Sequence, residues 1–337
     1  MVRLLSAYLF IALVLFTAIF GSAVSCNKQV TPSASASVPH AVSMSVPHEG
    51  VWGLYELDLS SLAVKLIYNT SDEIFTSALR LNNTGDRLVF GQKVGGSADT
   101  DFEIFSIKID GSGLSRITSN NYWDLYPVWS PDGGSVAFLS RRDKDLDIYL
   151  MSADGTNEKR LFDSGDNDAD IDWAGDSIVF TSRSAVWKIN EDGTSPVQLT
   201  YPPGLGEWGK ANLPKGDYDP RLSKDGKYVV FARLEDAETL HGGYNFFKIN
   251  IDGTAEVRLT YNSYSQSLAS WSHSAEKIVY VVAAIEGVGK YDIYMMNQDG
   301  TGNHNITPAY FPPDFLCFSP VFSKDDTKIF FIGRWWE

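Results

Sequence analysis

The residues of this sequence best suited to chemistry are aspartates that stand at fixed distances before a repeated apolar position. Counting back three and five residues from Trp129, Trp173 and Leu222 gives the set Asp124, Asp168, Asp170, Asp217 and Asp219. If these segments are neighbouring strands around one axis, we expect the five carboxylates to surround a common opening.

Clustered carboxylate oxygens suit a hard cation such as Ca²⁺, and they also suit a basic peptide segment. We therefore predict a binding site at this opening, with the metal ligands Asp168, Asp170, Asp217 and Asp219. The alternative is that these aspartates cap turns and face water, as aspartates between strands often do.

Aromatic residues accompany the carboxylates. Trp123 directly precedes Asp124, and Trp208 stands in the long segment at 201–216. An exposed ring among polar groups can stack on a sugar or anchor a peptide. We expect Trp123 and Trp208 to belong to the same binding site, and the alternative is that Trp208 packs its own loop.

No motif for catalysis accompanies these residues. The sequence contains no G-x-S-x-G, no Walker-type loop and no H-E-x-x-H. We therefore predict no catalytic residues and favour a binding protein. The alternative hypothesis is a carbohydrate-active enzyme, a lyase or hydrolase, in which the carboxylates act with a divalent metal.

Charge and cysteine content limit the classes of partner. The net charge of −14 argues against nucleic acid, because phosphate binding needs clustered Lys and Arg. The two cysteines, Cys26 and Cys317, cannot form a disulfide framework. With 44% apolar residues the chain can still build a sizeable core.

Short strands in a repeating pattern must position the candidate site. The unit YPVWSPDGGSVAFLS followed by DIYLMSADGTNEKRL recurs, and its aromatic anchors are 42 to 51 residues apart at Phe90, Phe138, Phe180, Phe231, Tyr280 and Phe331. Asp-Gly pairs such as Asp154-Gly155 mark tight hairpin turns. Four strands about every 45 residues are typical of a β-propeller blade.

The two ends of the repeat region complement each other. The last unit, 320–333, contains only the first hairpin, and the first segment, 53–68, contains only the second. Each would leave an open strand edge. We predict that they pair, so that the region 50–337 is an all-β, six-bladed propeller of four-stranded antiparallel blades.

Units of the form P-x-W-S-P-D-G followed by D-I-Y-x-M-x-x-D-G-T resemble those of the TolB-like, WD-like propeller family, and the resemblance covers residues 51–334. It implies a six-bladed fold. TolB itself carries a separate α/β domain before its propeller, whereas here residues 27–49 occupy that place. This difference weakens any expectation of a direct role in a Tol–Pal system.

The N-terminal region is typical of an export signal. Arg3 precedes an apolar run from Leu4 to Phe20, and small residues lead up to Cys26. We predict a signal peptide over 1–26 with lipidation at Cys26, followed by a flexible Ser/Ala/Pro tether over 27–49. The alternatives are cleavage to a soluble protein and retention of the run as a membrane anchor.

Together these features predict an exported, lipid-anchored scaffold in the cell envelope, either in the periplasm or on the outer surface. Its expected partner is an envelope protein or a basic peptide segment.

Overall fold

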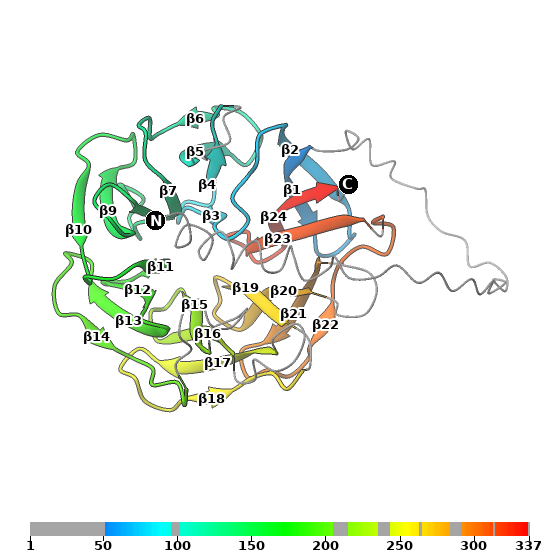
Figure 1. The fold of residues 1–337 in the computed structure, drawn as a ribbon. Helices are drawn as coiled ribbons and strands as arrows, with labels where there is room; N and C mark the ends of the chain where they lie inside the picture. The colour runs from blue at the N-terminus through cyan, green and yellow to red at the C-terminus, as the bar shows by residue number, and fades with distance from the viewer. Residues whose placement is uncertain are drawn as a thin grey trace, which may run out of the picture.

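The computed structural model describes residues 51–95, 102–204, 215–234, 243–262, 265–283, 291–312 and 314–335. These residues form six antiparallel sheets of four strands each, arranged as blades around a central axis (Figure 1). The prediction of an all-β, six-bladed propeller is confirmed. The predicted signal peptide, Cys26, the tether and Trp208 lie outside the described residues.

The strands of each blade are given from the axis outward. Blade 1 consists of β3 (Arg80–Leu81), β4 (Arg87–Lys93), β5 (Phe102–Lys108) and β6 (Ser115–Arg116). Blade 2 consists of β7 (Asp124–Trp129), β8 (Ser135–Ser140), β9 (Asp147–Ser152) and β10 (Lys159–Phe162). Blade 3 consists of β11 (Asp168–Ala174), β12 (Ser177–Ser182), β13 (Ala185–Asn190) and β14 (Val197–Gln198).

The other half of the ring follows the same plan. Blade 4 consists of β15 (Gly216–Leu222), β16 (Tyr228–Leu234), β17 (Tyr244–Asn250) and β18 (Val257–Arg258). Blade 5 consists of β19 (Ser265–Trp271), β20 (Lys277–Ala283), β21 (Tyr291–Asn297) and β22 (His304–Asn305). Blade 6 consists of β23 (Phe315–Phe322), β24 (Lys328–Trp335), β1 (Trp52–Asp58) and β2 (Val64–Thr70).

Blade 6 closes the ring by pairing the two ends of the described chain, as predicted. Strand β1 runs antiparallel to β24 in a register that extends from the pair Trp52 and Arg334 to the pair Asp58 and Lys328. Tyr55 stacks on Phe331 with the ring centroids 5.4 Å apart. Both leftover edges are therefore covered, which removes the exposed strand edge that each half-blade would leave.

The core lies between neighbouring blades, where the repeated anchors are packed. The six aromatic anchors, Phe90, Phe138, Phe180, Phe231, Tyr280 and Phe331, are fully buried. Trp129, Trp173 and Trp271, near the ends of three inner strands, are also buried. Packing therefore explains why large aromatic side chains recur at these positions.

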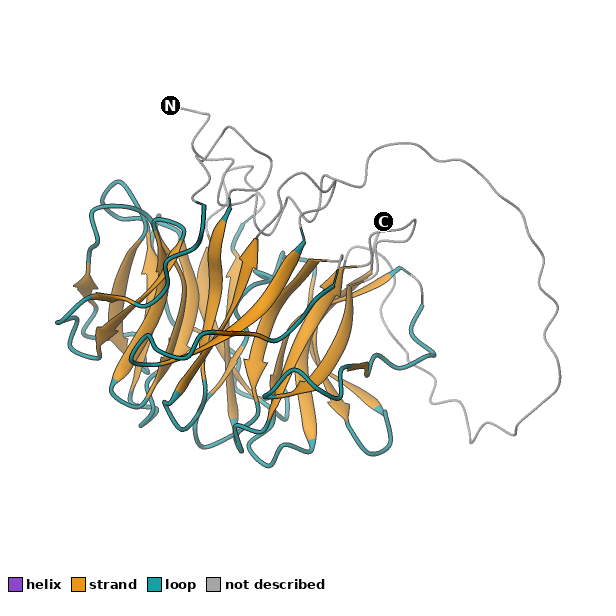
Figure 2. Ribbon diagram, turned by 90° about the horizontal axis from the view of Figure 1, so that it is seen from below, coloured by secondary structure: helices purple, strands orange, loops and turns teal. Residues whose placement is uncertain are grey.

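The hairpin turns give the molecule two different faces (Figure 2). Turns within the hairpins are short; at Asp154, the Oδ1 atom accepts hydrogen bonds from the Thr156 backbone N–H at 3.0 Å and its hydroxyl at 2.6 Å. Gly155 has φ of 87°, the positive value that such a turn requires. We call this side the turn face, and the side where the inner strands begin the loop face.

Candidate functional site

The inner strands share an irregularity that decides where the candidate aspartates point. Near its end each inner strand of blades 2 to 6 has a large apolar residue, which we call the strand anchor: Trp129, Trp173, Leu222, Trp271 and Phe322. Three positions before the strand anchor, these five strands carry a residue in the left-handed region, with φ between 44° and 56°: Tyr126, Asp170, Asp219, Leu268 and Ser319. The pairing of each strand with its neighbour shifts at this place. A bulge changes the alternation of side chains, so the positions three and five before the strand anchor have different surroundings.

The aspartates five positions before the strand anchor interact within their own blade. Asp124 accepts hydrogen bonds from the hydroxyl of Ser140 at 2.6 Å and from the amide of Asn120 at 2.7 Å. Asp217 accepts a bond from Arg233 Nε at 2.6 Å. Both carboxylates are fully buried. They connect the inner strand to the second strand or to the preceding loop.

Asp168 has the most perturbed environment of this group. It is fully buried and accepts a hydrogen bond from the Ser164 hydroxyl at 2.6 Å. Burial raises its pKa to about 7, and the neighbouring carboxylates of Asp147 and Asp163 contribute in the same direction. Hydrogen bonds from Ser164 and Ser182 only partly oppose this rise.

Asp170 and Asp219 lie two residues further along the inner strands than Asp168 and Asp217, and they connect neighbouring blades. Asp170 Oδ2 accepts a hydrogen bond from the backbone N–H of Asp219 at 3.2 Å, and Asp219 Oδ2 accepts one from the backbone N–H of Leu268 at 2.6 Å. Arg221 forms an ion pair with Asp219. Burial, with Asp219 nearby, raises the pKa of Asp170 to about 6. These two carboxylates therefore link blades 3, 4 and 5.

The structure thus brings Asp170 and Asp219 together and holds Asp124, Asp168 and Asp217 in three separate blades. Among the described residues, no group of three or more His, Cys, Asp or Glu side chains is arranged to hold a metal ion. Binding of Ca²⁺ or of a basic peptide by the five aspartates stays a prediction.

The Trp123 side chain is partly packed against the protein and is not fully exposed to solvent. It is half-buried against the apolar cluster that contains Phe75 and Leu125. The Arg141 guanidinium lies 5.6 Å from the centre of its ring. Because Arg141 lies over the ring and the apolar cluster packs against it, only part of the Trp123 ring is accessible to a ligand.

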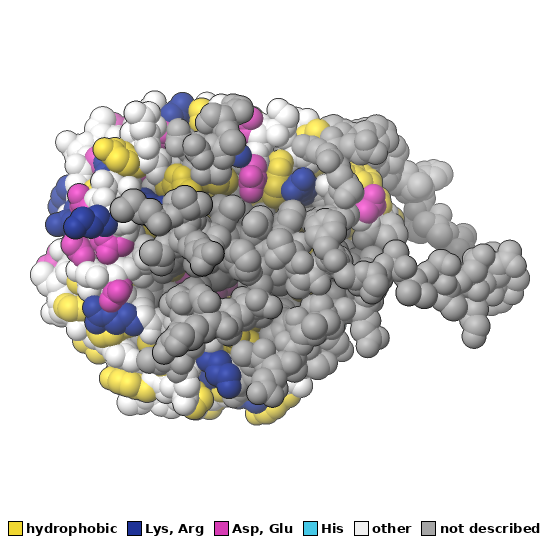
Figure 3. All heavy atoms as spheres, viewed as in Figure 1, with side chains coloured by type: hydrophobic (Ala, Val, Ile, Leu, Met, Phe, Trp, Pro, Cys, Tyr) yellow, Lys and Arg dark blue, Asp and Glu magenta, His cyan; other side chains and the backbone are white. Residues whose placement is uncertain are grey.

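Four exposed apolar side chains lie on the outer rim of the neighbouring blades 3 and 4. Tyr201 and Tyr261 are 75% and 76% exposed, and Val197 and Val257 are 46% and 47% exposed. We call these four residues the rim patch. They occupy matching positions, on or just after the outer strands β14 and β18, and Figure 3 shows hydrophobic side chains along this part of the rim.

Contacts between blades 3 and 4 fix the two halves of the rim patch relative to each other. Lys188 Nζ donates a hydrogen bond to the Ile251 carbonyl at 3.2 Å. A Cβ atom at Gly253 would lie 3.5 Å from the Leu199 carbonyl oxygen. The Arg258 guanidinium lies 4.6 Å from the centre of the Tyr261 ring. The sequence signal was the repeated Leu-Thr-Tyr at 199–201 and 259–261, but its exposure only became evident in the structure.

Comparison with known proteins places the chain in a family. The model of the TolB beta propeller domain matches residues 53–275. This chain belongs to the TolB β-propeller domain family. No helix among the described residues of this TolB-like propeller is long and apolar enough to span a bilayer.

Two relatives and one solved structure illustrate the similarity. An uncharacterised protein of Agrobacterium fabrum is 31% identical over 129 residues, which cover 36% of this chain and 40% of that protein. The Tol-Pal system protein TolB of Syntrophus aciditrophicus is 36% identical over 75 residues, covering 22% of this chain and 17% of that one. The matches therefore span less than half of either relative.

The solved structure shares the fold. A structure assigned as TolB from Agrobacterium tumefaciens superposes with a TM-score of 0.65 at 15% identity, covering 85% of this chain and 98% of that one. At this level of identity the similarity concerns the fold alone.

Proposed function

We propose that this TolB-like propeller is a binding scaffold of the cell envelope and that it holds a protein partner on its outer rim. The observation that carries the proposal is the rim patch of Val197, Tyr201, Val257 and Tyr261. Large exposed apolar side chains that gather in one place mark interaction sites on soluble proteins.

The chemistry of the rim patch suits a protein surface. Tyrosine offers a large, rigid contact area together with a hydroxyl group, and Tyr and Arg are enriched among the residues that dominate binding energy. Arg258 already lies against the Tyr261 ring, so it is oriented before a partner arrives. A partner with basic groups around an apolar centre would complement the net charge of −14.

Location in the envelope rests on the N-terminal pattern. The apolar run and the small residues before Cys26 are typical of an exported lipoprotein. A relative described as a Tol-Pal system protein is consistent with that location. In the proposal, the lipid on Cys26 and the tether hold the propeller near a membrane with its rim accessible.

Binding to an envelope partner tests this proposal. The purified protein is immobilised, proteins captured from the native envelope fraction are identified, and the dissociation constant of the purified partner is measured. Tyr201→Ser/Tyr261→Ser is expected to weaken binding tenfold or more, because residues at the centre of an interface often contribute about 2 kcal/mol each.

The control removes two other exposed apolar side chains elsewhere on the ring. Leu62 and Leu114 are 40% and 43% exposed and lie in turns of blades 6 and 1. Leu62→Ser/Leu114→Ser is expected to bind like the native protein. Equal loss in both variants would reject the rim patch as the site, and absence of any captured protein would reject the scaffold.

A further inference from the structure

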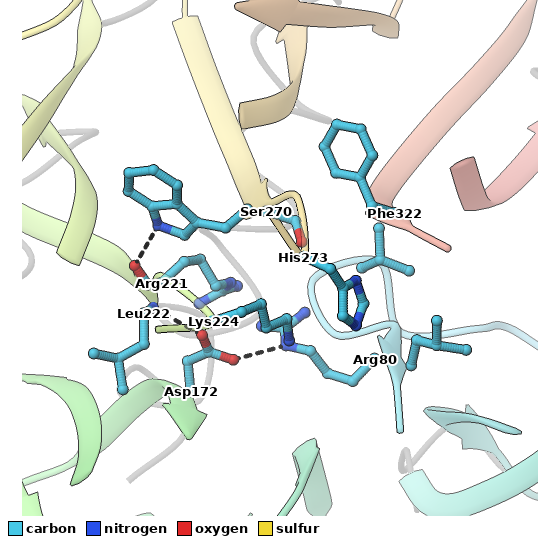
Figure 4. A pocket seen from close by; sticks show the side chains of 11 residues that line it. Arg80, Asp172, Arg221, Leu222, Lys224, Ser270, His273 and Phe322 are labelled. Atoms are coloured by element: carbon cyan, nitrogen blue, oxygen red, sulfur yellow. Dashed lines mark hydrogen bonds and ion pairs between the residues drawn. The ribbon is translucent and has the colours of Figure 1, made fainter. Parts of the chain in front are cut away.

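A small pocket opens near the turn face of the channel, away from the rim patch. Inner strands of blades 1, 3, 4 and 5 and their turns contribute its polar lining: Arg80, Asp172, Arg221, Lys224, Ser270 and His273. Figure 4 shows the Arg80, Arg221 and Lys224 side chains and the His273 ring gathered around the same space. The cavity measures about 20 Å³, which is room for one or two water-sized groups.

The pocket lining carries more positive than negative charge. Asp172 is its one carboxylate among the described lining residues. Both oxygens of that carboxylate are occupied, because Oδ1 accepts from Arg80 Nε at 3.3 Å and Oδ2 accepts from the Leu222 backbone N–H at 2.9 Å. Arg80, Arg221 and Lys224 therefore face a single, already bonded anion in a chain whose net charge is −14.

Two guanidinium groups in this lining keep donors without a partner. Arg80 is 8% exposed and Arg221 is 2% exposed. Within the described part of the chain, neither Arg80 Nη2 nor Arg221 Nε has a hydrogen-bond acceptor. Leaving a buried charged donor unsatisfied is costly, so these atoms favour the arrival of an acceptor.

The two arginines also repel each other. Burial and the neighbouring Arg221 lower the pKa of Arg80 to about 10, so Arg80 stays charged at neutral pH. Asp219 pairs with Arg221 from deeper in the channel, whereas burial and the nearby Arg80 lower the pKa of Lys224, with Asp172 opposing. An anion placed between the three cations would relieve this repulsion.

We propose that this pocket binds a carboxylate group. A carboxylate is small and planar, and each of its two oxygens can accept a charge-assisted hydrogen bond from a guanidinium donor. Those properties match a narrow cavity that presents Arg80 Nη2 and Arg221 Nε, with Lys224 supplying charge. The carboxylate belongs either to a free organic acid or to an acidic side chain of a bound polypeptide; the chemistry recognised is the same.

His273 provides a built-in reporter for occupancy. Its ring lines the pocket, and its pKa is lowered by burial and by the nearby Lys224 and Lys324, with Asp326 opposing. A bound carboxylate adds a negative charge beside the ring and is expected to raise the pKa of His273.

The test is an NMR titration of the His273 ring in the intact protein, with its signals assigned by His273→Gln. Sodium acetate is added at constant ionic strength against sodium chloride, followed by inorganic phosphate. Acetate is expected to shift the signals saturably and to raise the His273 pKa. A blocked peptide containing one glutamate distinguishes the sources, because tighter binding than acetate indicates a polypeptide and equal binding a free acid.

Two lysines of one turn supply the variant and its control. Lys224→Gln is expected to weaken acetate binding about tenfold, the usual effect of losing a hydrogen bond to a charged group. Lys227→Gln is the matched control. Lys227 pairs with Asp225 at 2.9 Å and does not line the pocket. The proposal is overturned if chloride produces the same shifts, if Lys224→Gln binds like the native protein, or if phosphate binds more tightly than acetate.

Discussion

Arg233 donates two hydrogen bonds to Asp217, from Nε to Oδ1 at 2.6 Å and from Nη2 to Oδ2 at 2.9 Å. The same guanidinium group donates to Glu256 at 2.6 and 2.9 Å and lies 4.5 Å from the centre of the Phe247 ring. One arginine thus fastens the inner strand of blade 4 to the segment before its outer strand. This arrangement makes Asp217 part of the architecture of its blade.

Removing that carboxylate should destabilise the fold. Asp217→Asn leaves the buried Arg233 with Glu256 alone, and breaking a buried ion pair from one side costs about 3 kcal/mol or more. Urea denaturation at pH 7 measures the loss. Asp166→Asn is the control, because Asp166 pairs with Arg183 where both side chains are more than half exposed, and such pairs contribute less than about 1 kcal/mol. Similar losses in both variants would contradict this account.

Gly333→Ala should destabilise the blade that closes the ring. A Cβ atom at this position would lie 2.5 Å from Phe315 Cζ and 2.7 Å from Tyr55 Cε2. Neither ring can move without disturbing the packing of β1 against β24, so we expect a loss of about 1–3 kcal/mol from overpacking. Thermal unfolding measures it.

Gly204→Ala serves as the control for that experiment. There the nearest atom to the new Cβ is the flexible Lys215 side chain at 3.6 Å. An unchanged melting temperature for Gly333→Ala would argue against the pairing of β1 with β24.

Asp168 should make the protein less stable as the pH rises from about 4 to 7. An unfolded aspartate has a pKa of about 3.9, whereas burial raises that of Asp168 to about 7. Between these values the folded protein holds a proton that the unfolded chain releases, so the free energy of unfolding falls with increasing pH. At about 1.4 kcal/mol per pKa unit, the change is at most about 4 kcal/mol.

Comparing pH 4.5 with pH 7.5 by urea denaturation checks this sign. The difference should shrink in Asp168→Asn and persist in Asp192→Asn, because the hydrogen bond from Thr194 lowers the pKa of Asp192 and places its titration below this window. If the native protein and Asp168→Asn show the same difference, the buried carboxyl does not titrate there.

Cys26 should carry the membrane anchor. Mass spectrometry of the mature N-terminus is expected to find a lipid-modified peptide that begins at Cys26. Cys26→Ser should move the protein from the membrane fraction to the soluble fraction without altering its melting temperature. A native N-terminus that is unmodified at Cys26, or that retains Met1, would contradict lipidation.

The sequence by itself determined the ring. Repeated anchors such as Phe138 and Phe231, turn pairs such as Asp154-Gly155 and the two complementary half-repeats are local or periodic signals, so they specified strand count, turn positions and closure. Each reflects a requirement that the chain meets within one repeat, namely burial of an aromatic ring or a positive φ in a turn.

Only the tertiary structure decided what surrounds each charge. Arg80 and Asp172 are 92 residues apart in sequence and meet at 3.3 Å because blades 1 and 3 share the central channel. The bulges gave Asp168 and Asp170 different surroundings, and likewise Asp217 and Asp219, although an even alternation would have placed each pair on one face of its strand. Electrostatic partners depend on which inner strands meet across the channel and on strand register, and neither is determined by the spacing within a single repeat.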